Sequence, residues 1–162
     1  MFDFIASRWL DISYRGFQHA SLVVQALVLA TILGVGLAIA VVSQDRLRGI
    51  ANAVSSVGLT IPSFALLGLL LPLLGIGTLP SFAAVLFYAI LPILRNAVTG
   101  LSQVSPTLLE SARGMGLSPV QTMLRVRLPL AWPVILTGVR ISAQMSMGVA
   151  AIAAYALGPG LG

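Results

Sequence analysis

Residues 109–129 read LESARGMGLSPVQTMLRVRLP, and this polar stretch decides the fold because of what surrounds it. It holds the only glutamate of the chain, three of its nine basic residues, two closely spaced glycines and two prolines. The sequence on both sides is almost purely apolar. A basic interruption between long apolar segments is typical of a loop that joins two membrane spans.

The composition places the whole chain in a membrane. Of its 162 residues 58% are hydrophobic and 8% are charged, whereas a soluble domain has about 25% charged residues. The net charge of +5 comes from arginines in short loops between apolar runs, which indicates loop charge bias and not a nucleic-acid surface. The absence of cysteine excludes a disulfide or a thiolate metal site. We therefore expect an all-α, polytopic membrane helix bundle.

Four spans are predicted. The stretch between Arg48 and Arg95 would be about 69 Å long as one helix, more than twice the ~30 Å hydrocarbon core, so it must turn back. The glycines and proline of GIGTLPS provide the turn at 75–81. The expected spans are 21–43, 52–74, 82–99 and 130–156.

The arginines predict the orientation. Two lie in the N-terminal segment, and six lie in the segments on the other side, namely Arg46, Arg48, Arg95, Arg113, Arg125 and Arg127. The positive-inside rule then places the N-terminus outside and the 109–129 stretch in the cytoplasm. Residues 1–19, with Phe2, Ile5 and Trp9 at helical spacing, favour a short interfacial helix. Arg140 falls inside the fourth span, and we expect it within about two turns of the cytoplasmic end.

Small residues and prolines mark the spans as more than anchors. Ala30, Gly34 and Ala38 recur every four residues, which allows close helix packing. Four prolines interrupt hydrogen bonding in or near spans, and such backbone is tolerated where it is buried or lines a cavity. They are Pro62, Pro72, Pro92 and Pro133. Together these features indicate a bundle with a pathway.

The polar loop itself reads as two short helices. Ser105-Pro106 and Ser118-Pro119 are both helix-start signals, a capping hydroxyl followed by proline at the first helical position. Gly114 and Gly116 end the first helix, and the second runs to about Arg127. From these residues alone, an amphipathic connector on the membrane surface is an equal alternative to a docking surface.

The spacing in this loop resembles a known signature. Glu110-Ser111-Ala112, then Gly116 after three residues, and Val126-Arg127-Leu128-Pro129 after nine more, resemble the EAA signature of ATP-binding-cassette importer permeases. Further similarity, to permeases for glycine betaine, carnitine and choline, lies in TIPSFALLGLLLPLLGIG at 60–77, LPILRNAVTGL at 91–101 and LPLAWPVILTGVR at 128–140. Such permeases continue with another span beyond a turn like GPGLG at 158–162. The domain of residues 20–162 is therefore expected to lack a last span.

The resemblance implies a fold, partners and sites. It implies the type I importer permease fold in a bacterial inner membrane, with coupling helices at about 105–127 that dock on a cytosolic ATPase. The implied coupling residues are Glu110, Ser111, Ala112, Arg113, Gly116, Leu128 and Pro129. Implied partners are two ATPase subunits, a second permease copy or paralogue, and an extracytoplasmic substrate-binding protein; ATP and magnesium belong to the ATPase. Our candidates for the pathway lining are Pro62, Ser63, Phe64, Ser142 and Ser146.

Other classes of function fit less well. A phosphate-binding loop requires lysine, and the chain has none, so it is not an ATPase itself. An ion-coupled carrier usually needs an acid in the membrane, but Asp3, Asp11, Asp45 and Glu110 all fall outside the expected spans. The lone His19 does not support an intramembrane hydrolase. A permease for another small solute, an amino acid or related amine, remains an alternative, and less so a channel or scaffold.

Overall fold

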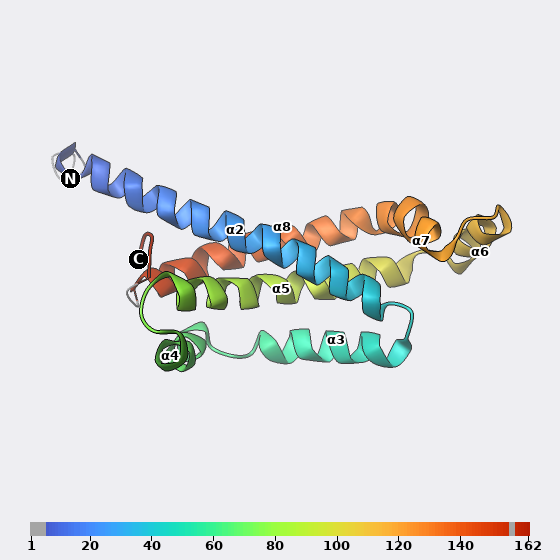
Figure 1. Cartoon of the computed structure of the whole chain (residues 1–162), viewed down its shortest axis with the longest axis horizontal. Coiled ribbons are helices and arrows are strands. Elements are labelled where there is room, and N and C mark those ends of the chain that lie inside the picture. The colour runs from blue at the N-terminus through green and yellow to red at the C-terminus, as the bar shows by residue number, and fades with distance from the viewer. Residues whose placement is uncertain (1–5, 156–157) are drawn as a thin grey trace.

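Long helices that lie side by side form the bulk of the molecule (Figure 1). The computed structural model describes residues 6–155 and 158–162, and no strand occurs among them. The helices are α2 (Trp9–Val41), α3 (Asp45–Gly58), α4 (Ser63–Leu74), α5 (Thr78–Gln103), α6 (Pro106–Gly114), α7 (Pro119–Thr122), a π-helix η1 (Met123–Arg127) and α8 (Leu128–Tyr155). The all-α prediction is confirmed.

Three helices are long and apolar enough to span a membrane, and a bent pair adds a fourth candidate. The three are Trp9–Val41, Thr78–Gln103 and Pro119–Ala154. The pair is α3 with α4, which meet at 93°. The segment expected as a span at 52–74 is therefore not one continuous helix. The chain turns at 59–62 because Pro62 has no N–H to continue a helix and favours extended backbone before it.

The expected interfacial helix is not a separate element. From Trp9 onward its residues form the first turns of α2, which runs without a break to Val41. No glycine or proline separates Trp9 from His19 except Gly16, and a single glycine costs a helix only about 1 kcal/mol. Phe2 and Ile5 lie outside the described residues. The N-terminal part of α2 projects past the ends of α5 and α8 (Figure 1).

The core lies where α5 packs between α2 and α8. Ala30, Gly34 and Ala38 are all buried on α2, as their spacing predicted. A Cβ on Gly34 would lie 2.9 Å from the side chain of Ile93, so only glycine permits this approach of α2 to α5. Close packing of this kind is the main attraction between helices in a membrane.

The second short helix of the loop is continuous with the last span. α7 passes into η1 and then α8, so the expected end near Arg127 is wrong. Pro129 has no N–H to bond the carbonyl of Arg125 four residues earlier. The N–H of Leu128 reaches back five residues to Met123 instead. The helix thus absorbs the proline by widening for one turn.

Contacts between α5 and α8 fix the height of Arg140. A Cβ on Gly138 would lie 2.9 Å from the carbonyl oxygen of Pro92, and Ser142 donates a hydrogen bond to Ala89 at 2.6 Å. Arg140 therefore lies level with the middle of α5, about 18 Å from the Gln103 end of that helix. The distance of Arg140 from the membrane interface, which we expect to be within about two helical turns, stays a prediction.

Candidate functional site

The polar loop forms a compact unit at one end of the bundle, where α6 and α7 lie (Figure 1). Pro106 occupies the first turn of α6 as predicted, but the Ser105 side chain makes no capping hydrogen bond. The end of α6 is well defined. The N–H of Leu117 bonds the carbonyl of Ala112 at 3.1 Å, that of Gly116 bonds Arg113 at 2.9 Å, and Gly116 has φ +85°. A left-handed glycine with such bonds is a common helix stop.

The start of α7 is held by a reciprocal cap. The Ser118 hydroxyl accepts from the N–H of Gln121, and the Ser118 N–H donates to the Gln121 side chain at 2.9 Å. This capping box satisfies two backbone donors that α7 would otherwise leave free. Gly116 terminates α6 and Ser118 caps α7, and only Leu117 lies between them. The angle between α6 and α7 is therefore set by these local contacts.

The residues of the signature occupy different environments. Ala112 is buried, and Leu128 is half-buried and packs against the core cluster that contains Leu101 and Ile135. The Ser111 hydroxyl donates to the carbonyl of Thr107 at 2.8 Å. Glu110 and Pro129 are exposed. Small, apolar members therefore hold the loop on the bundle, and Glu110 remains available at the surface.

Glu110 forms no ion pair with any residue that the structure describes. Among the described residues the ion pairs are Arg15 with Asp11 and Arg48 with Asp45, so the alternative of a Glu110–Arg113 pair is not realised. An exposed carboxylate among arginines can accept charge-assisted hydrogen bonds from another subunit.

The five pathway candidates do not share one environment. Pro62, Ser63 and Phe64 lie at the bend between α3 and α4, and the Phe64 side chain is 63% exposed. Ser142 and Ser146 are fully covered by neighbouring helices. Ser142 is hydrogen-bonded to Ala89, whereas the Ser146 hydroxyl has no partner. The bend is held by a hydrogen bond from the Tyr88 hydroxyl to the carbonyl of Ile61.

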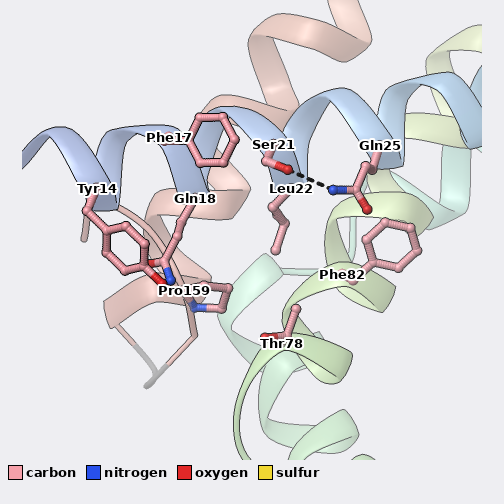
Figure 2. A pocket seen from close by; sticks show the side chains of 9 residues that line it. All are labelled: Tyr14, Phe17, Gln18, Ser21, Leu22, Gln25, Thr78, Phe82 and Pro159. Carbon is pink, nitrogen blue, oxygen red and sulfur yellow. Dashed lines mark hydrogen bonds between the residues drawn. The ribbon is translucent and has the colours of Figure 1, made fainter.

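A pocket of about 250 Å³ lies at the opposite end of the bundle from α6. Figure 2 shows Tyr14, Gln18 and Leu22 pointing from α2 toward Pro159 and the start of α5. Phe82 and Thr78 complete that side, and Ser21 binds Gln25 at 2.7 Å. Sequence analysis missed this pocket because its walls come from three segments, at 14–25, 78–82 and 159, that are far apart along the chain.

A bundle of apolar helices with a rigid, basic, two-helix loop at one end defines a multi-pass membrane permease subunit. The chain belongs to the family of binding-protein-dependent transport system inner membrane components, whose profile matches residues 20–162.

Curated relatives and one solved structure agree with this assignment. The chain is 35% identical to the choline transport system permease protein OpuBB of Bacillus subtilis, over 99% of this chain and 74% of the relative. It is 43% identical to the osmoprotectant import permease protein OsmW of Salmonella typhimurium, over 90% of this chain and 70% of the relative. The fold matches a chain of the inward-facing MetNI methionine transporter with TM-score 0.76 and 20% identity, over 92% of this chain and 76% of the other. The ATP-binding-cassette importer permease fold is confirmed.

Proposed function

We propose that this permease forms the translocation pathway for an osmoprotectant such as glycine betaine, choline or carnitine. The observation that carries this proposal is the relatedness to curated permeases for these compounds across nearly the whole chain. A second copy or a paralogue completes the pathway, and an extracytoplasmic binding protein delivers the solute. An amino acid or related amine is the alternative solute.

Transport is driven by a cytosolic ATPase, of which two copies dock on the permease pair and bind ATP with magnesium. The defined angle between α6 and α7 supports this role, because closure of the ATPase must reach the spans through a rigid link. Exposed Glu110 contacts the ATPase. Ser111, Ala112, Arg113 and Gly116 shape the coupling helix, and Leu128 and Pro129 join it to α8.

The pathway candidates provide a passage and not a tight site. Pro62, Ser63 and Phe64 stand at an irregular, partly exposed bend, where an aromatic face can attract a quaternary ammonium group. Ser142 and Ser146 become accessible only if α5 and α8 separate during transport, since both are covered here.

The six-to-two arginine asymmetry supports an extracytoplasmic N-terminus and a cytoplasmic α6.

Uptake of labelled solutes tests the solute class. Cells that lack other osmoprotectant uptake systems and express this permease with its ATPase and binding protein should accumulate labelled glycine betaine, choline or carnitine. Accumulation of amino acids but none of the three would overturn the proposed solute class and leave the permease assignment standing.

The docking role is tested with Glu110→Lys. Membrane insertion should be unchanged because no span is altered, whereas copurification of the ATPase and uptake should both be lost through charge reversal. Arg46→Glu reverses an exposed charge outside α6 and is the matched control. Wild-type ATPase retention and uptake in Glu110→Lys would identify the loop as a connector only.

A further inference from the structure

A small pocket lies where the polar loop meets the membrane helices. Its volume is about 100 Å³, and it is lined by Ser43 just after α2, Arg113 in α6 and Arg127 in η1. We call it the arginine pocket. The rest of its wall is formed by Leu109, Pro119, Thr122 and Met123. The pocket thus joins three elements that are far apart in sequence.

Positive charge converges on this pocket without a matching acid in its lining. Arg113 and Arg127 both line the pocket, and no acidic residue is part of its wall. Arg48 is paired with Asp45, but no ion pair neutralises Arg113 or Arg127 among the described residues. Arg127 uses its Nε–H to bond the carbonyl of Leu101 at 2.8 Å, so its terminal nitrogens remain available. Two guanidinium groups on one pocket favour an oxyanion such as phosphate.

Thr122 provides an independent sign of a missing ligand. Its side chain is only 5% exposed, it lines the arginine pocket, and its hydroxyl has no hydrogen-bond partner. A buried hydroxyl without a hydrogen-bond partner destabilises the fold, so such groups usually have a partner. A bound oxyanion would accept this hydrogen.

An apolar groove continues from the arginine pocket. The groove is about 310 Å³, shares Ser43, Pro119 and Met123 with the pocket, and is otherwise lined by Ile39, Val120 and Leu124. Val120 and Leu124 are 66% and 56% exposed. A carboxylate of a partner protein or a free ion needs no such groove, whereas an acyl chain does.

We propose that the arginine pocket binds the phosphate of an anionic phospholipid of the cytoplasmic leaflet, with the acyl chain in the adjoining groove. The leaflet follows from the proposed orientation. Basic pockets between membrane helices on this side commonly hold lipid headgroups. The lipid would bridge α6 to the ends of α2 and α8 and so brace the loop against the spans.

Native mass spectrometry of the detergent-purified transporter, permease with its ATPase, tests the site. Phosphatidylglycerol should bind in preference to phosphatidylcholine. Arg113→Gln should weaken phosphatidylglycerol binding roughly tenfold or more, and Thr122→Val roughly threefold to tenfold, through lost hydrogen bonds. Leu124→Gln should weaken the lipid but not inorganic phosphate. Arg46→Gln, an exposed arginine outside the pocket, should change the affinity by less than about twofold.

Three outcomes would overturn the proposal. Equal binding of both lipids, or equal losses in Arg46→Gln and Arg113→Gln, would mean diffuse surface charge. Binding of inorganic phosphate that excludes the lipid, with no effect of Leu124→Gln, would mean a simple anion site. Unchanged lipid affinity in Arg113→Gln with loss of the ATPase would assign the pocket to the protein partner. None of these measurements depends on which solute is transported.

Discussion

Gly116 is the residue on which the shape of the polar loop depends. Its φ of +85° is left-handed, but a Cβ there would meet nothing within 4 Å. The requirement for glycine is therefore conformational and not steric. A non-glycine residue in this conformation costs about 1–2 kcal/mol.

We expect Gly116→Ala to distort the end of α6 and to lower uptake several-fold while the protein still inserts. Gly114→Ala is the matched control, because Gly114 has ordinary φ and equally open surroundings. Uptake per inserted permease measures the effect. Equal uptake by the two variants would show that the turn does not depend on the left-handed residue.

Arg140 is exposed on α8 at the level of the middle of α5. Insertion of an arginine at the centre of a span costs about 2.5–3.5 kcal/mol, and such residues usually face protein or water. We expect Arg140→Cys in the assembled transporter to react with a water-soluble thiol reagent. Ile32→Cys, on an exposed apolar part of α2, should not react. The reverse pattern would place Arg140 toward lipid.

Single residues show where sequence analysis succeeds and fails. Ser118 caps its helix as predicted, since Gln121 three residues on completes a reciprocal box. Ser105 has no such partner and does not cap, although its dipeptide with proline is the same. Thr122 and Arg127 line a common pocket only because the end of α2, α6 and η1 pack together, and no local sequence pattern predicts that packing.

At the scale of elements, glycine sets the distance between α5 and α8. A Cβ on Gly138 would lie 2.8 Å from Cβ of Asn96 and 2.9 Å from the carbonyl oxygen of Pro92. The α5 backbone cannot easily move away from this contact. Gly138→Ala should therefore overpack the α5–α8 crossing and lower the free energy of unfolding by about 1–3 kcal/mol.

The measurement for the α5–α8 crossing is thermal unfolding of the purified permease in detergent. Gly148→Ala, on the same helix with nothing within 4 Å, is the control and should unfold near the wild-type temperature. If Gly138→Ala matches that control, the helices separate enough to admit a methyl group.

The length and apolarity of α2, α5 and α8 were predictable because they are local properties of the chain. The bend between α3 and α4 was only half predictable. Pro62 predicts an interruption of the helix. The 93° angle, however, is stabilised by the hydrogen bond from the Tyr88 hydroxyl to the carbonyl of Ile61, and these two residues are 27 positions apart. Likewise Pro129 predicted a boundary, while the helix continues through η1 because a wider turn tolerates the missing donor.

At the scale of the molecule, the fold fixes which segments share each end of the bundle, so that only the orientation of the whole bundle in the membrane has to be determined. The start of α2 and residues 158–162 lie at one end, and α6 and α7 lie at the other (Figure 1). The C-terminal segment is fixed there by a hydrogen bond from the N–H of Leu161 to His19. One orientation measurement therefore assigns both ends.

Single cysteines make that measurement on the naturally cysteine-free chain. Ser13→Cys should react with an impermeant thiol reagent added outside intact spheroplasts, because the arginine bias places the start of α2 outside. Gln103→Cys should react only after the membrane is opened, which is the control for reactivity. Labelling of Gln103→Cys alone from outside would invert the proposed topology.

We assign ATP hydrolysis to a partner subunit and not to the permease. The chain has no lysine and so cannot form a phosphate-binding loop with its essential Lys. We expect purified permease to show no ATP hydrolysis, and hydrolysis to appear when the ATPase subunit is added. We also expect Gly116→Ala to alter the hydrolysis rate of the assembled complex, because a distorted loop would transmit ATPase closure poorly. Gly114→Ala should leave that rate unchanged. ATPase activity that copurifies with the permease alone, and persists after removal of every partner, would contradict this division.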